Sequence, residues 1–243
     1  LVLPTCVLLL FSSLANGQVA ISAPETATTP SVDHSHVTND ANAVSVSGLQ
    51  GGLVVQLGSS DVTTATELSK TGRYLFHVLD TNAKNVNAAQ QQIHNDGHYG
   101  LSWAEHTQNP NRLPYAENVV NLIIIQDYSI PVAELLRVLT PGGAIVLADP
   151  ELMPTGALSH AEIETPHEQG DFIVAAKRWP MAMDVWSHPR HAADGNAVSS
   201  DTLVGPPERV RWIAAATSEV EGMVTSGGRN FYGGILARDS FNG

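Results

Sequence analysis

Short apolar runs alternate with segments of helical period along the chain from Leu49 onward. The predicted strands cover residues 53–57, 74–79, 101–104, 122–125 and 144–148, and the predicted helices cover residues 62–70, 86–95 and 132–139. A further strand is predicted at the sheet edge, over residues 171–177. Strands that alternate with helices in this way are typical of a parallel sheet covered by helices on both faces. The pattern therefore predicts a doubly wound α/β domain.

Two segments in the middle of the chain carry the clearest signal. Residues 123–125 are three consecutive isoleucines, as expected of a strand that is buried on both faces. Residues 134–139 show the apolar stripe of a helix packed on a core. Gly142 and Gly143 follow, and because glycine adopts left-handed backbone angles easily, we expect them to end that helix.

The first part of the chain has a different composition. Residues 1–14 are almost wholly apolar and lead into small residues, which is typical of a signal peptide over residues 1–17 and predicts export to the periplasm or the cell exterior. The alternative is a buried first strand or helix. Residues 18–47 are rich in Thr, Ser, Ala, Asn and Pro and are interpreted as a flexible linker. Cleavage near Gly17 would remove the chain's one cysteine, Cys6.

Composition narrows the classes of partner. The 243 residues are 43% hydrophobic, which suffices for a buried core. The formal net charge is −12, and no run of Lys or Arg occurs. Nucleic acid and anionic membrane surfaces are therefore not expected as partners.

Residues 113–125, with the sequence LPYAENVVNLIII, and residues 134–143, with the sequence ELLRVLTPGG, together resemble the second half of a class I S-adenosylmethionine-dependent methyltransferase. The resemblance implies a Rossmann-like doubly wound parallel sheet over residues 48–178. It also implies that S-adenosylmethionine binds at the carboxyl ends of the first strands, where the strand order reverses.

The loop after the first strand departs from the pattern of that family, which has an acidic residue two positions before Gly-x-Gly-x-Gly. Gly58 keeps the first glycine, Ser60 replaces the second, and Val62 stands in place of the third. Gln56 occupies the acidic position and carries no charge. A β-branched residue at position 62 is a serious departure, because the backbone must approach the cofactor closely there.

Other positions follow the family pattern. Asp80 comes where the family binds both ribose hydroxyls with a carboxylate, although it can equally cap the helix that starts near Asn82. Glu105 comes where an acid often lies near the adenine amino group, with a solvated loop charge as the alternative. Asp127 and Tyr128 follow the fourth strand, on the substrate side. The cofactor-binding residues implied by the resemblance are Gln56, Gly58, Ser60, Asp80, Glu105 and Asp127.

From Trp179 onward the chain carries Trp, Pro, Gly and short β-prone runs, which predicts an all-β segment over residues 179–243. Residues 186–191, 195–199, 205–212, 224–229 and 236–243 resemble the start of a quinoprotein-type β-propeller. Because about sixty residues cannot complete a propeller, we expect one incomplete blade of a truncated chain. The residues present supply no ligands for pyrroloquinoline quinone.

Histidine clusters and known catalytic motifs add little. His188 and His191, with Asp184 nearby, have a spacing that suits a metal, but an ordinary loop is favoured and no metal is assigned. No Gly-x-Ser-x-Gly elbow, Walker loop, EF-hand loop or Cys-x-x-Cys-His motif occurs.

Two functions follow from the sequence. One is methyl transfer from S-adenosylmethionine to an unknown acceptor, where alignment of the acceptor supplies most of the catalysis. The other is a methyltransferase-like domain that has lost its cofactor and acts as a scaffold or binding module ahead of a propeller.

Overall fold

The computed structural model describes residues 43–206, 210–214, 222–233 and 236–243. The signal peptide expected over residues 1–17 and nearly all of the expected linker lie outside these ranges. Residues 43–46, at the end of that linker, are helical, and Ala43 and Val44 are buried in the core. In the described ranges, no helix has the length and apolar character needed to cross a membrane.

A seven-stranded sheet forms the main body, in the order β3-β2-β1-β4-β5-β7-β6. Strands β1 to β5 run parallel, and β7 pairs antiparallel with both β5 and β6. The strands are β1 (Gly52–Leu57), β2 (Tyr74–Asp80), β3 (Ser102–His106), β4 (Val120–Ile125), β5 (Leu139–Leu147), β6 (His167–Gln169) and β7 (Phe172–Ala176). The doubly wound sheet expected from the sequence is confirmed.

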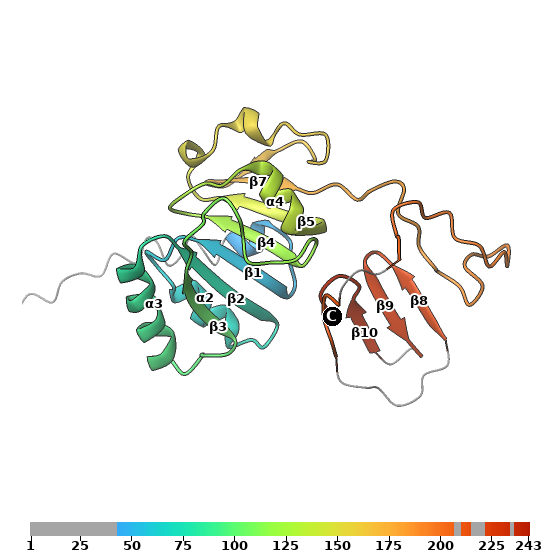
Figure 1. Cartoon of the computed structure of the whole chain (residues 1–243), viewed down its shortest axis with the longest axis horizontal. Coiled ribbons are helices and arrows are strands. Elements are labelled where there is room, and N and C mark those ends of the chain that lie inside the picture. The colour runs from blue at the N-terminus through green and yellow to red at the C-terminus, as the bar shows by residue number, and fades with distance from the viewer. Residues whose placement is uncertain (1–42, 207–209, 215–221, 234–235) are drawn as a thin grey trace, which may run out of the picture. The chain divides into compact units, whose positions relative to one another are not determined.

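Helices cover both faces of this sheet (Figure 1). The helices α2 (Thr63–Ser69) and α3 (Ala83–Asn95) pack on one face, through a core that includes Ala65, Ile93 and Phe76. The helix α4 (Val132–Val138) packs on the other face, and two short 3₁₀ helices, η1 (Pro150–Leu152) and η2 (Thr155–Leu158), follow β5. All six residues of β4 are buried, which explains its run of isoleucines.

The Pro-Gly-Gly sequence lies inside a strand and does not end a helix, which corrects the expectation from the sequence. Helix α4 ends at Val138, and Leu139 already has extended backbone angles. Pairing with β4 slips between Leu139 and Ala144, so residues 140–143 form a bulge in β5. Gly142 has φ of 75°, and a Cβ on Gly143 would approach the Thr140 carbonyl oxygen to 2.9 Å. The glycines are needed for this bulge.

A buried lysine closes the carboxyl end of α4. Lys177 Nζ donates hydrogen bonds to the Leu136 and Leu139 carbonyl oxygens at 2.7 and 2.9 Å and to Asn118 Oδ1 at 2.7 Å. Burial lowers the pKa of this amine from its ordinary value. Since helices leave their last carbonyl oxygens without intrahelical partners, the lysine takes the place of a capping motif.

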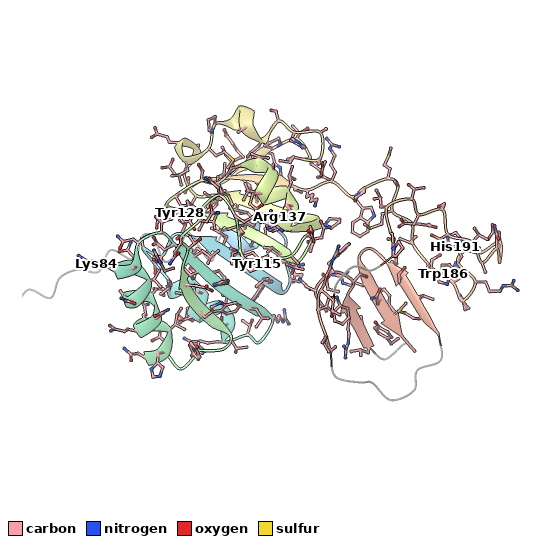
Figure 2. The ribbon with its side chains drawn as sticks, in the orientation of Figure 1. Lys84, Tyr115, Tyr128, Arg137, Trp186 and His191 are labelled. Atoms are coloured by element: carbon pink, nitrogen blue, oxygen red, sulfur yellow. The ribbon has the colours of Figure 1, made fainter. Side chains whose placement is uncertain are left out.

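An ion pair joins the two segments that define the sequence signature. Glu134, in α4, accepts hydrogen bonds from the Leu113 backbone N–H at 2.7 Å and from Arg137 Nε at 2.8 Å. Arg137 in turn donates to the Tyr115 carbonyl oxygen at 2.8 Å (Figure 2). Hydrogen bonding by Arg137 lowers the pKa of Glu134. The long connection between β3 and β4 is thereby held against α4 without a helix of its own.

A separate three-stranded antiparallel sheet follows, in the order β10-β9-β8. Its strands are β8 (Met223–Ser226), β9 (Arg229–Tyr232) and β10 (Leu236–Asp239). The all-β character expected after Trp179 is confirmed for the described residues. Whether this sheet begins a propeller stays a prediction.

Candidate functional site

The candidate site lies at the carboxyl ends of β1, β2 and β4. The chain runs outward to β2 and β3 on one side of β1 and to β4 and β5 on the other, so the strand order reverses between β1 and β4. Ligands of open α/β sheets bind at such a point. The topology brings the loop at residues 58–62, Asp80 and Asp127 to this edge, as the sequence predicts.

Gly58 begins the loop after β1 and has φ of 122°, a backbone conformation that favours glycine. Its N–H donates to the Leu79 carbonyl oxygen at 2.8 Å. A Cβ at this position would overlap the Asp127 carboxylate and lie 2.6 Å from its Cγ. The glycine therefore leaves room for a side chain of the protein itself.

Asp80, the last residue of β2, is only 4% exposed, and its carboxylate is engaged by the protein. Its Oδ2 accepts the Ser59 backbone N–H at 3.0 Å, the Ser59 hydroxyl and, at 3.4 Å, Asn85 Nδ2. Its Oδ1 accepts the Asn82 backbone N–H at 2.7 Å. The interpretation of Asp80 as the helix cap is wrong, because Asn82 caps α3 by accepting the Lys84 N–H.

Asp127 lies on the opposite side of the loop. Its Oδ1 accepts the Ser60 hydroxyl at 3.1 Å and its Oδ2 lies 3.4 Å from the Ser60 backbone nitrogen. The backbone N–H groups of Gln126 and Asp127 both donate to the Leu57 carbonyl oxygen at 3.1 Å. Residues 58–60 are thus held between two carboxylates.

Gln56 lies beneath the loop and is fully buried. Its Nε2 contacts the Gly58 and Asp61 carbonyl oxygens at 3.0 and 2.9 Å and Gln126 Oε1 at 2.8 Å. Its own Oε1 is buried with no hydrogen-bond partner among the described residues. Gln56 therefore holds the path of the loop and does not point out of it.

Tyr128 closes the site from the β4 side. Its hydroxyl donates to the Leu79 carbonyl oxygen at 3.1 Å. Burial, reinforced by the charges of Asp80 and Asp127, raises the pKa of this phenol well above its ordinary value. The phenol is neutral at physiological pH and serves as a hydrogen-bond donor.

Glu105 lies elsewhere than the sequence suggests. It is part of β3 and does not follow it, and it pairs in register with Leu79. Its carboxylate lies 3.4 Å from His77 Nε2, on the face of the sheet that α4 covers. Glu105 therefore faces a residue of strand β2 and does not face the loop at residues 58–60. The sequence does not single out His77 or Ser59, because a mid-strand histidine and a loop serine carry no motif.

The arrangement of these residues does not fit S-adenosylmethionine. The carboxylate expected to bind the ribose hydroxyls is occupied by Ser59, Asn82 and Asn85. The Asp127 carboxylate fills the space beside Gly58, where the cofactor would need close approach to the backbone. A carboxylate that already accepts this many hydrogen bonds has little capacity left for a diol.

In the all-β segment, His191, which is labelled in Figure 2, belongs to a local hydrogen-bond network around Asp184. Asp184 Oδ2 accepts His191 Nε2 at 2.6 Å, the Ser200 N–H at 2.7 Å and the Ser199 hydroxyl at 3.0 Å. The Ser200 N–H, followed by His191, holds the pKa of Asp184 well below its usual range. Over the residues whose placement is described, no group of three His, Cys, Asp or Glu side chains is positioned to bind a metal ion.

Comparisons with known proteins match at the level of structure alone. No protein-family model matches the sequence, and no curated protein does. A putative S-adenosylmethionine-dependent methyltransferase from Methanococcus maripaludis matches with 15% identity and a TM-score of 0.49, over 60% of this chain and 86% of that one. The geranyl diphosphate C-methyltransferase from Streptomyces coelicolor A3(2) matches with 11% identity and a TM-score of 0.48, over 59% and 81%.

A third matching structure is the [4+2]-cyclase SpnF, with 18% identity and a TM-score of 0.41, over 46% of this chain and 43% of that one. At such identities and TM-scores these similarities carry no argument about activity. The fold assignment rests on the strand order and on the antiparallel β7. The chain has the Rossmann-like fold of class I methyltransferases, followed by a small antiparallel sheet.

Proposed function

We propose that this chain is a methyltransferase-like domain that no longer binds S-adenosylmethionine and acts as a scaffold or binding module. The observation that supports this most is the Asp80 carboxylate, which is buried and bonded to Ser59, Asn82 and Asn85. Asp127 supports it from the other side of the loop. Ser60, Val62 and Gln56, where the family has two glycines and an acid, support it from the sequence.

Methyl transfer from S-adenosylmethionine is the second candidate. It is favoured by the exposure of Ser60 and Asp127, since an exposed contact opens more easily than a buried one. This function requires that the hydrogen bonds between Ser59 and the Asp80 carboxylate break. Export and a following propeller remain proposals that agree with either function.

Isothermal titration of the full chain with S-adenosylmethionine and with S-adenosylhomocysteine separates the two candidates. The scaffold proposal predicts no saturable heat with either compound at millimolar concentration. Stoichiometric binding of either compound would refute it and favour the second candidate. A variant with Asp127→Ala and Ser60→Gly serves as the matched comparison, because it removes the contact on the exposed side of the loop.

A further inference from the structure

Leu75, Leu101 and Trp103 form a partly exposed apolar strip along the β3 edge of the sheet. The strip lies on the same face as α4, which does not cover this edge. β3 is the edge strand of the sheet, and among the described residues its outer side pairs with no other strand apart from a single bridge between Tyr99 and Ser102. Leu101, Trp103 and Glu105 alternate onto one face, and Leu75 of β2 adjoins them, since Phe76 donates to the Leu101 carbonyl oxygen. Leu75 and Leu101 are 45% and 39% exposed. The Glu105 carboxylate lies at the end of this strip.

His77 supports the strip from beneath. It is 3% exposed, and its ring stacks on Trp103 with centroids 4.4 Å apart and an interplanar angle of 24°. One face of the indole is thereby covered and held in place. Trp103 is only half-buried, and Glu105 follows it on the same face of the strand.

The protonation of His77 follows from its neighbours. Burial raises the pKa of the Tyr115 phenol and lowers the pKa of His77 to about 4, so both are neutral near pH 7. The phenol then donates its proton to Nδ1, with which it is hydrogen-bonded, and Nε2 carries the ring proton. Nε2 is buried without a well-formed hydrogen bond, and Glu105 Oε2 lies 3.4 Å away. His77 thus lies between the two side chains, with its ring against Trp103 and its Nε2 facing Glu105.

Glu105 keeps most of its capacity to bind a cation. Its side chain is 60% exposed, and among the described residues no lysine or arginine pairs with it. An indole beside a carboxylate suits a cation on an apolar stem, because the ring face attracts the charge and the carboxylate pairs with it. The net charge of −12 adds a long-range attraction for basic partners.

We propose that Trp103 and Glu105 form a binding site for the guanidinium group of an arginine in an extended peptide that lies along the edge strand β3. On the outer edge of β3 the Ser102 N–H and the Ala104 carbonyl oxygen are already bonded, to His98 and Gln90. An extended peptide would therefore pair with the remaining outward backbone groups of this strand, and alternate side chains of such a peptide reach one face of the sheet. Apolar residues two positions before and after the arginine, which share its face, would lie over Leu75 and Leu101. This site is independent of the loop at residues 58–60 and of cofactor binding.

The test is a titration of the full chain with the peptide Ac-Val-Ser-Arg-Ser-Val-NH2, whose valines share the face of the arginine, followed through the indole N–H signal of Trp103 in nitrogen-15 NMR spectra. The signal is assigned from its loss in Trp103→Phe. We expect a saturable shift that weakens about tenfold in Glu105→Gln, as the loss of one charged contact implies. The matched control, Glu168→Gln in the exposed strand β6 at the opposite edge, should bind as the wild type does.

Two further ligands test whether the guanidinium group and the peptide backbone both contribute to binding. A peptide with norleucine in place of arginine should give no saturable shift. Free arginine amide should bind more weakly than the peptide, because it lacks the backbone contacts to β3. Equal binding of the norleucine peptide, equal binding of arginine amide, unchanged affinity in Glu105→Gln or the absence of any shift with the arginine peptide would each overturn the proposal.

Discussion

Asp80 accepts the backbone N–H of Ser59 at 3.0 Å, across the edge of the sheet where β1 and β2 end. The carboxylate also accepts the Ser59 hydroxyl. In a cofactor-binding Rossmann-like domain, an acid at this strand end is turned toward a ribose. Here the same residue type stabilises the loop, so a position that follows the family pattern performs a structural task.

Asp80→Asn should therefore destabilise the protein. In this variant an NH2 group takes the place of one carboxylate oxygen, and it cannot accept the hydrogen bonds that this oxygen accepts. We expect the free energy of unfolding to fall by about 2 to 3 kcal/mol. Urea unfolding followed by circular dichroism measures it. Asp96→Asn, at the exposed end of α3, is the control and should change the free energy by less than about 0.5 kcal/mol. Equal stability of the two variants would argue against a structural role for Asp80.

Acidification should destabilise the fold through His77. Its folded pKa of about 4 lies below the ordinary value of 6.5, so the unfolded chain binds the proton more readily. Stability is then complete above pH 6.5 and falls as the pH decreases toward 4, by on the order of 3 kcal/mol. Urea unfolding at pH 7 and pH 4.5 measures the slope.

His77→Gln should flatten this pH dependence, whereas His94→Gln, at the exposed end of α3, should leave it unchanged. Carboxylates also titrate at the acidic end of this range. The contribution of His77 is therefore measured as the difference in pH dependence between the two variants. An equally steep pH dependence in His77→Gln would contradict the assignment.

Glu134→Gln should loosen the connection between β3 and β4. The substitution replaces an acceptor of the Arg137 guanidinium by an amide and weakens the bond to the Leu113 N–H. We expect a loss of about 2 kcal/mol and faster proteolytic cleavage within residues 107–118. Arg137→Lys keeps the charge but not the forked geometry and should give a similar cleavage pattern. Cleavage at the wild-type rate in both variants would show that the pair does not hold this segment.

Gly143→Ala should destabilise the bulge in β5. The new Cβ would lie 2.8 Å from Thr140 Oγ1 and 2.9 Å from Leu139 Cγ, and overpacking of this kind costs about 1 to 3 kcal/mol. Gly156→Ala, in η2, is the matched control, since outside its own stretch of chain no described atom lies within 4 Å of the position that its new methyl group would take. Thermal unfolding of both variants measures the difference. Equal melting temperatures of the two variants would show that the backbone at Gly143 is not tightly packed and would contradict the bulge.

The sequence predicts the sheet well because burial leaves a direct pattern, as in the isoleucines at residues 123–125. It also places Gly58, Asp80 and Asp127 at one edge, since the ends of parallel strands meet there. It does not reveal that Asp80 bonds Ser59 or that Glu105 turns toward His77. Those contacts depend on loop paths and side-chain rotamers, which have no periodicity. The Pro-Gly-Gly bulge has the sequence pattern of a helix end because the same glycines serve both structures.

Amide hydrogen exchange at Ser59 tests the central claim most directly, because this N–H is the one that Asp80 accepts. The closed loop predicts slow exchange in the full chain and the same rate when S-adenosylmethionine is added at millimolar concentration. Rapid exchange without the cofactor, or a change in rate at Ser59 when it is added, would contradict the account and indicate a loop that opens to bind it.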